Sequence, residues 1–304
     1  MNSFSVFKIS SPMGCNVYFV NTNPAVIIDA GHPYFAQETF EILQGSVPLE
    51  KVAYILCTHS HPDHLGAATL LKNATSAKLC ILPIEKNDKL TPLHKREIKL
   101  DMEEVQFDHF MKKDERIELD NDSIEIIHTP GHADDHCCLY FTQRQFLFTG
   151  DLIANEDTGF LNLNKPYQIS LNELNESIDR CAQLPTRRVF SGHGDTYRIA
   201  PWDKLKRKLL LFKKNPQILI SHSLISPFLF YLWAHEKVSR KDGEQYIADH
   251  VYLFDGFLQQ VSVDLILKEF RVLVSLLEAR NVISRTGDIY SSRFSREIQS
   301  QWFK

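Results

Sequence analysis

Three histidines and an aspartate lie within six residues, directly after an apolar segment at 52–57 whose length and composition are typical of a buried strand. They are His59, His61, Asp63 and His64. Each imidazole needs a polar partner when it is buried, and these side chains in one loop would compete for too few partners. A divalent cation satisfies all of their lone pairs, because imidazole nitrogen and carboxylate oxygen are ligands of zinc and related metals. The cluster therefore predicts a metal site at the end of a strand.

Three later motifs each place one further ligand-type side chain beside a glycine at the end of an expected strand. His132 follows Thr-Pro-Gly, Asp151 follows Thr-Gly, and His193 lies within Ser-Gly-His-Gly-Asp. Glycine lets the backbone approach closely, so such loops can aim their side chains at a shared centre. Together with the first cluster they supply seven ligands, enough for two metal ions with an open position for water or substrate.

The chain divides near residue 200 by both pattern and charge. Residues 1–200 alternate apolar strands with helices and carry a net charge of −9, which indicates an α/β layered domain. Residues 201–304 carry +5, so the overall −4 is a cancellation. In this tail, Ser262 can cap an amphipathic helix, and 282–290 is typical of a hairpin. We therefore expect a catalytic domain over 1–200 and a mainly helical, winged-helix-like domain over 201–304.

Taken together, the histidine and aspartate motifs resemble those of the metallo-β-lactamase superfamily over roughly residues 10–200. The resemblance implies an αβ/βα sandwich with the metals at the loop-bearing edge of the two sheets. It also implies two sets of ligands bridged by Asp151: a first metal held by His59, His61 and His132, and a second held by Asp63, His64 and His193.

The same resemblance implies a hydrolytic mechanism. Two divalent ions, with zinc expected and manganese or iron as alternatives, would lower the pKa of a bridging water so that hydroxide attacks the substrate. Asp63 would orient this nucleophile or accept its proton, so it is the expected catalytic residue. Asp29, in Ile-Ile-Asp-Ala-Gly, matches a further family motif with Ala in place of Thr. Its implied role is to orient a ligand loop, and an ordinary turn or cap is the alternative.

The segment 129–136, Thr-Pro-Gly-His-Ala-Asp-Asp-His, is similar to a motif of the lactamase-β-like 2 group, which pairs this fold with a winged-helix-like C-terminus. With glyoxalase II, this group implies cleavage of a small thioester, ester or lactone. The alternatives are an endonuclease acting on single-stranded RNA, a one-iron persulfide dioxygenase, and a metal-containing regulatory protein that acts by binding. Within the segment, we expect Asp134 and His136 to be structural residues rather than ligands.

The tail leaves several partners open. The basic segment 204–214 predicts an amphipathic helix. The charged face of this helix either lies in solvent or contacts the backbone of RNA. Aromatic residues of the tail could form an apolar acyl pocket or a homodimer interface. The apolar window 218–234 predicts a buried helix beginning at Ser226 and Pro227, not a membrane span. Six cysteines without C-x-x-C spacing, and an N-terminus without a signal-peptide pattern, favour free thiols and a cytoplasmic location.

Overall fold

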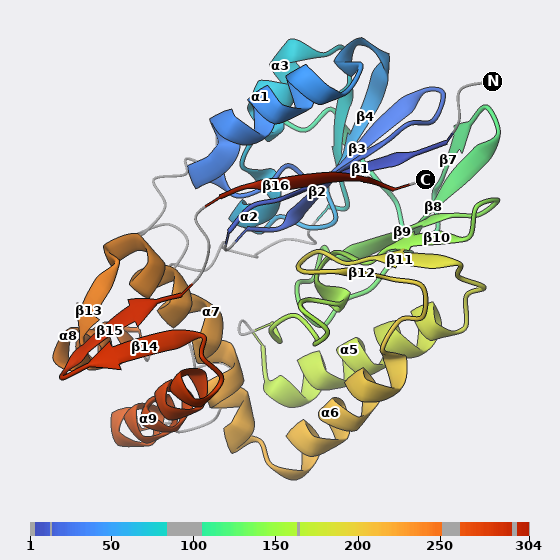
Figure 1. Cartoon of the computed structure of the whole chain (residues 1–304). Helices are drawn as coiled ribbons and strands as arrows, with labels where there is room; N and C mark the ends of the chain where they lie inside the picture. Colours follow the sequence, from blue (N-terminus) through green and yellow to red (C-terminus); the bar gives the residue numbers. More distant parts are fainter. Residues whose placement is uncertain are drawn as a thin grey trace.

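Two β-sheets lie face to face, and helices cover the outer face of each (Figure 1). The computed structural model describes residues 4–12, 14–83, 105–162, 165–250, 262–293 and 297–303. The arrangement confirms the αβ/βα sandwich that the family resemblance implied.

Among the described residues, the first sheet contains seven strands: β1 (Val6–Ser10), β2 (Asn16–Val20), β3 (Ala25–Ile28), β4 (Val52–Leu56), β5 (Lys78–Ile81), β6 (His109–Phe110) and β16 (Gln299–Phe303). They are arranged in the order β16-β1-β2-β3-β4-β5-β6, and β3 to β6 are parallel. The connecting segments contain η1 (Pro33–Phe35), α1 (Ala36–Ser46), η2 (Leu49–Lys51), α2 (Pro62–Leu65) and α3 (Ala68–Ala74). α1 and α3 cover the outer face of this sheet (Figure 1).

In the part of the chain that the structure describes, the second sheet contains six strands: β7 (Arg116–Leu119), β8 (Asp122–His128), β9 (Cys137–Phe141), β10 (Phe146–Phe148), β11 (Arg188–Phe190) and β12 (Thr196–Tyr197). β9 is antiparallel to both β8 and β10, and β11 is parallel to β10. β8, β10 and β11 therefore run in one direction, so their C-terminal ends share an edge of the sheet. The short helix η4 (Gly150–Leu152) follows β10, and α5 (Tyr167–Ala182) and α6 (Trp202–Lys214) cover the outer face.

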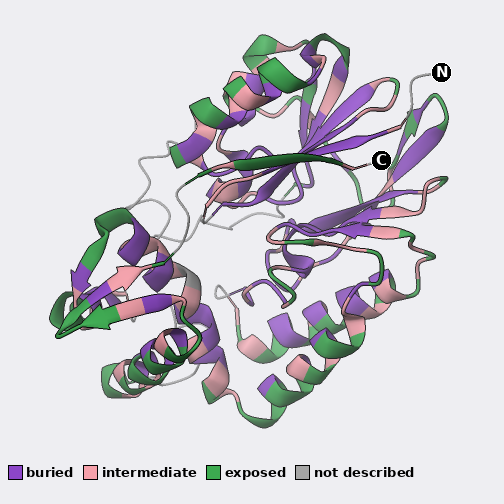
Figure 2. Cartoon of the chain, viewed as in Figure 1, coloured by how far each residue is buried: buried purple, intermediate pink, exposed green. Residues whose placement is uncertain are grey.

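The interior of the sandwich is an apolar layer supplied by alternate residues of both sheets. Its largest members include Tyr18, Phe141, Phe148 and Phe190, all almost fully buried. Figure 2 shows the buried residues concentrated where the two sheets face each other and on the inner sides of the helices. All six cysteines are free and buried, as the sequence predicted.

The tail continues this packing. It contains α7 (Gln217–His235), β13 (Lys237–Ser239), α8 (Arg240–Asp249), α9 (Val263–Ala279), β14 (Ile283–Thr286) and β15 (Ile289–Ser292). One apolar cluster runs from β9 and α5 through α6 and α7 into α9. The Ser262 side chain caps α9 by accepting a hydrogen bond from Leu265 N, and β14 and β15 form the expected hairpin. The relation of these elements to a winged helix stays a prediction.

The apolar helix of the tail begins earlier than its sequence indicated. α7 starts at Gln217, after Pro216, and Pro227 lies inside it rather than at its first turn. Leu224 and Phe228, on either side of this proline, are buried in the shared core, and such packing can outweigh the lost backbone hydrogen bond. Among the described residues, α7 is the one helix long and apolar enough to cross a membrane, and 53% of its apolar window is buried inside the protein.

The last strand departs from the expected domain boundary. β16 pairs antiparallel with β1, so residues 299–303 belong to the first sheet and not to the region that begins at 201. The Trp302 ring lies 4.9 Å from that of Phe7, measured between centroids. Pairing between the two ends of a chain leaves no local periodic signal, which is why the sequence did not predict it.

Candidate metal centre

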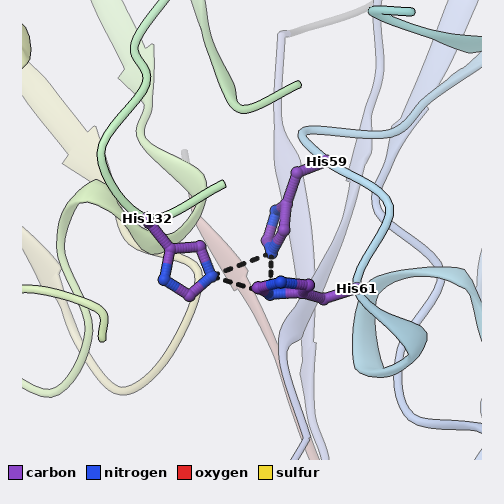
Figure 3. A group of neighbouring side chains, drawn as sticks. All are labelled: His59, His61 and His132. Atoms are coloured by element: carbon purple, nitrogen blue, oxygen red, sulfur yellow. Dashed lines mark hydrogen bonds between the residues drawn. The ribbon is translucent and has the colours of Figure 1, made fainter. Parts of the chain in front are cut away.

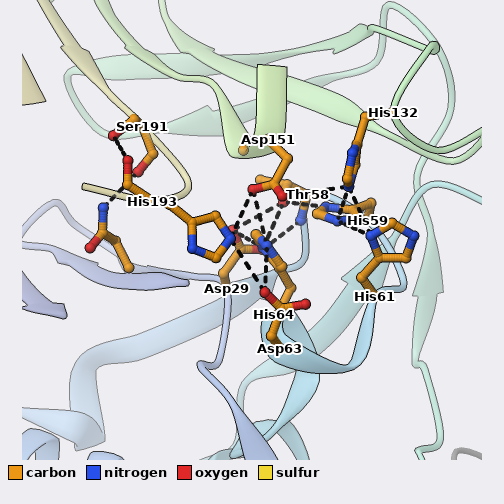
Figure 4. Close-up of polar contacts among 12 residues, drawn as sticks. Asp29, Thr58, His59, His61, Asp63, His64, His132, Asp151, Ser191 and His193 are labelled. Carbon is orange, nitrogen blue, oxygen red and sulfur yellow. Dashed lines mark hydrogen bonds and ion pairs between the residues drawn. The ribbon is translucent and has the colours of Figure 1, made fainter. Parts of the chain in front are cut away.

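All of the ligand-type loops leave the two sheets at the same edge. The loop after β4, together with α2, carries the residues from 59 to 64. His132 follows β8, Asp151 lies in η4 after β10, and His193 follows β11. Because these strands end side by side, the structure brings all seven sequence-predicted residues together (Figure 4).

The first group consists of His59, His61 and His132, each of which points a ring nitrogen at the other two (Figure 3). His132 Nε2 is 3.2 Å from His59 Nε2 and 2.8 Å from His61 Nδ1. The latter two nitrogens are 3.0 Å apart. Nitrogens bound to a tetrahedral Zn²⁺ at about 2.0–2.1 Å would be separated by about 3.3 Å. The three rings therefore suit one metal ion.

The second group consists of Asp63, His64 and His193, and Asp151 lies between the two groups (Figure 4). Asp151 Oδ1 is 3.2 Å from His64 Nε2 and 3.3 Å from His193 Nε2. The other oxygen, Asp151 Oδ2, is 3.5 Å from His132 Nε2 in the first group. Asp63 Oδ2 is 3.3 Å from His193 Nε2. One carboxylate thus directs one oxygen toward each group.

The chemistry of this cluster fits divalent cations. His64 Nε2 and Asp151 Oδ1 are buried and face each other at 3.2 Å, yet neither atom makes a hydrogen bond of suitable geometry. Unpartnered buried polar atoms are costly, and a cation between these two atoms would satisfy both. Imidazole nitrogen and carboxylate oxygen suit zinc, manganese and iron. The residues present therefore fit two divalent ions.

The two groups differ in their protonation. Burial lowers the pKa of His59 well below its usual value and also lowers the pKa of His132, so both rings are neutral and keep lone pairs. Burial also opposes the charged form of His193, but Asp151 and Asp63 outweigh it and raise its pKa to about 10. The pKa of His64 is raised as well, since acidic neighbours outweigh its burial. A divalent cation would replace these imidazolium protons, so metal uptake at the second group releases protons.

Asp29 orients the first ligand loop, as the resemblance implied. Its Oδ1 accepts a hydrogen bond from Thr58 N at 2.8 Å, and its Oδ2 lies 2.9 Å from His64 Nδ1. Asp29 is only 2% exposed. A carboxylate on Nδ1 keeps the proton on that nitrogen and leaves Nε2 free to face the second group.

Two further contacts hold ligands of the second sheet. His132 Nδ1 donates to Phe160 O at 2.7 Å, which directs Nε2 into the first group. His136 Nε2 accepts a hydrogen bond from Asp151 N at 3.0 Å, while its Nδ1 lies 3.0 Å from Thr129 O. Burial lowers the pKa of His136 to about 3, so this ring is neutral. His136 is a structural residue that positions Asp151, which agrees with the sequence prediction.

The remaining residues of the motifs have plain structural roles. Asp134 accepts a hydrogen bond from Asn162 Nδ2 at 3.2 Å and pairs with Lys165, so it belongs to the loop and not to the ligand set. A Cβ built on Gly192 would lie 2.3 Å from Asp151 Oδ1. This glycine therefore allows the loop of His193 to lie directly against the bridging carboxylate.

Sequence reasoning missed a set of polar residues on β1 and β2 that contact the loop at 191–195. They are Lys8, Asn16 and Tyr18, and Ser10 supports them by donating to Asn16 Oδ1. The only signal for them was the presence of Lys8 and Asn16 in otherwise apolar strands, where a buried polar group needs a partner.

Two relatives match part of the chain. The "Beta-lactamase-like protein 2 homolog" of Caenorhabditis elegans is 27% identical over 184 residues, which are 60% of this chain and 56% of that protein. The "Hydroxyacylglutathione hydrolase" of Francisella tularensis subsp. novicida is 30% identical over 131 residues, which are 43% and 44% of the two chains. The chain thus spans about half the length of these relatives.

Solved structures show the same fold. The B3 metallo-β-lactamase BLEG-1 superposes with a TM-score of 0.55 and 23% identity, covering 67% of this chain and 99% of that one. A metallo-β-lactamase family protein from Thermus thermophilus gives 0.54 and 17%, covering 95% and 98%. The family model described as the metallo-β-lactamase superfamily matches residues 11–193, which include all seven residues of the candidate centre. The chain belongs to the metallo-β-lactamase superfamily.

Proposed function

We propose that the protein is a dinuclear metal hydrolase that cleaves a small thioester, ester or lactone, with zinc as its metal. The observation that carries the proposal is the position of Asp151, whose two oxygens face two separate groups of histidines at 3.2–3.5 Å. A single-metal centre would not need a carboxylate between two complete sets of ligands. An intact set of seven also argues against a regulator that acts by binding alone.

The proposed chemistry assigns a task to each part of the site. Two bound divalent ions would supply Lewis acidity and a water of lowered pKa. His59 and His132 are held neutral by burial and keep their lone pairs available near pH 7. Asp63 is half-buried, with one oxygen at 3.3 Å from His193 Nε2, so its other oxygen is available to orient a water or take a proton.

The contacts of α6 favour a small substrate over RNA. Three of its lysines form ion pairs with acidic residues of the catalytic part: Lys204 with Glu156, Lys206 with Asp179, and Lys208 with Asp157. Charges that are neutralised within the protein contribute little to phosphate binding. Relatives named hydroxyacylglutathione hydrolase further support an acyl substrate.

The test is a substrate panel with zinc-loaded protein. Acyl thioesters, aryl esters, lactones and a single-stranded RNA are assayed with the parent and with Asp63→Asn. We expect turnover of an acyl substrate that falls about 10²–10⁴-fold in Asp63→Asn. Asp134→Asn is the matched control, because this aspartate lies beside the ligand loop but pairs with Lys165.

Two results would overturn the proposal. One is cleavage of RNA alone, with loss in Asp63→Asn, which would favour the endonuclease. The other is a protein that takes up one iron and no second metal, which would favour the dioxygenase.

A further inference from the structure

The loop that carries His193 is held by side chains from the other sheet. Asn16 Nδ2 donates to Ser191 O at 2.9 Å and to Gly194 O at 3.0 Å. Tyr18 OH donates to Ser191 O at 2.7 Å. These bonds cross from β2 to the loop after β11, so they bind the two sheets together beside the metal centre. Figure 4 shows Ser191 and His193 of this loop together with the other residues of the candidate metal centre.

The network is complete and buried. Asn16 and Tyr18 are each 1% exposed. Asn16 Oδ1 accepts a hydrogen bond from Ser10 Oγ at 2.7 Å, and Asn16 Nδ2 also lies 3.1 Å from Tyr18 OH. The Lys8 ammonium, 4% exposed, donates to Gly194 O. Buried polar groups that are fully paired in this way fix a local geometry, because any displacement leaves one of them without a partner.

The network reaches only one of the two groups of ligands. Its acceptors are the carbonyls of Ser191, Gly192 and Gly194, which flank His193 in sequence; Gly192 O accepts from Asn16 N at 2.6 Å. His132 is held by a different contact, the hydrogen bond to Phe160 O. A change in the network therefore acts directly on the loop of His193 and reaches the first group only indirectly, through Asp151 and the loop at 154–162.

We propose that Asn16 and Tyr18 are positioning residues for the second metal ion. They hold the loop at 191–195 so that His193 Nε2 stays 3.3 Å from both Asp151 Oδ1 and Asp63 Oδ2, and thereby set the affinity of the second ion relative to the first. The inference rests on the proposed dinuclear centre. Under this proposal, two strand residues that lie outside every metal-binding motif control how many metal ions the protein holds.

The test compares the stepwise zinc affinities of Tyr18→Phe and Asn16→Asp with those of the parent. Tyr18→Phe removes the donor to Ser191 O and, with the same hydroxyl, one acceptor of Asn16 Nδ2. Asn16→Asp replaces the donating amide with a carboxylate that faces two carbonyls. The matched control is Tyr140→Phe, because Tyr140 is also a buried strand tyrosine whose OH donates to a backbone carbonyl, Pro185 O at 2.8 Å, although that bond is only partly buried. Pro185 precedes β11, at the opposite end from His193.

Chelator competition gives the two dissociation constants, and the absorption spectrum of the cobalt-substituted protein reports each coordination sphere. We expect the second constant to rise about 10-fold in Tyr18→Phe and about 100-fold in Asn16→Asp, with a clearly smaller change in the first constant. Tyr140→Phe should keep both constants.

The inference is overturned if Tyr18→Phe keeps both constants of the parent, or if it weakens both sites equally. Tyr18→Phe decides the matter even if Asn16→Asp fails to fold, because it removes a single hydroxyl. A parent protein that binds only one zinc would instead refute the dinuclear centre itself. The two failures are therefore distinguishable.

Discussion

Replacement of Asp29 by Asn tests how far the protein controls its metal centre through one buried carboxylate. In the parent, Asp29 accepts from Thr58 N and lies 2.9 Å from His64 Nδ1. Asparagine keeps the shape and can still accept from Thr58 N. Its amide group, however, would donate to His64 Nδ1, which moves the ring proton to Nε2, the nitrogen that faces Asp151 Oδ1.

The expected magnitude follows from this exchange of tautomers. Loss of a carboxylate partner behind a metal-bound histidine weakens metal binding about 10–100-fold, or about 1.4–2.7 kcal/mol. Most of the loss should fall on the second site, because His64 belongs to that group and Asp29 reaches His59 of the first group only through Thr58. The bond from Thr58 N also loses its charge assistance, which costs about 1 kcal/mol in the free energy of unfolding of the metal-free protein.

The assay combines stepwise zinc titration with nitrogen NMR shifts of the His64 ring, which distinguish the two tautomers. Asp122→Asn is the matched control, since Asp122 is a buried carboxylate that accepts from Ser123 N and Gln143 N at 2.8 Å, away from the metal centre. The reasoning is wrong if Asp29→Asn retains the second-site affinity of the parent, or if Asp122→Asn loses as much.

Three further changes test other parts of the structure. Gly192→Ala should displace Asp151 and reduce zinc content, as well as lowering the free energy of unfolding by about 1–3 kcal/mol, whereas Gly45→Ala, with open space at its Cβ, should not; equal zinc content in both would contradict this. Burial, together with Lys208, lowers the pKa of His222 to about 3, so between about pH 6.5 and 3 only the unfolded chain gains this proton. The metal-free protein should therefore lose about 1.4 kcal/mol of stability per pH unit from this residue as the pH falls, and His222→Phe should remove that component from the pH profile of urea unfolding; an unchanged profile would show that His222 titrates normally. Lys208→Met and Asp157→Asn should each lower the melting temperature, and a double-mutant cycle should give a coupling of about 0.5–1 kcal/mol; a coupling of zero would show that the pair is not formed in solution.

The convergence of the seven candidate ligands could be predicted from the sequence because each of them lies in a short motif at the end of a strand. His59 and His132 belong to loops whose glycines and prolines also mark them as turns. β8, β10 and β11 run in one direction, so their C-terminal ends lie along one edge of the sheet. The seven residues, which are spread over 135 positions of the sequence, therefore come together. Local pattern and topology were sufficient here.

The parts that sequence reasoning missed depend on contacts between distant segments. β16 pairs with β1 across almost the whole chain, and Asn16 meets Ser191 across the two sheets. Neither relation leaves a periodic signal in either segment. The start of α7 was misplaced for a related reason, since Pro227 is a common first residue of a helix and only the packing of its neighbours shows that the helix runs through it.

A single loop, residues 154–162, lies between the candidate metal centre and the tail. The loop at 154–162 contacts the ligands with its backbone: Phe160 O accepts from His132 Nδ1 at 2.7 Å, and Gly159 N donates to Asp151 O at 2.8 Å. It also bonds to the loop of His193 through Asn155 N at 3.1 Å. One short segment therefore touches a ligand of each metal group and the residue that lies between them.

The outer side of this same loop is held by α6 and α7. Lys208 of α6 pairs with Asp157, and the His222 ring of α7 lies 5.3 Å from that of Phe160. Part of the positive charge that could mark an RNA-binding surface is thus used within the molecule, on the acidic side chains of a loop that supports the metal ligands. Because the tail and the catalytic part also share one apolar core, the tail contributes to the geometry of the centre whether or not it contacts a substrate.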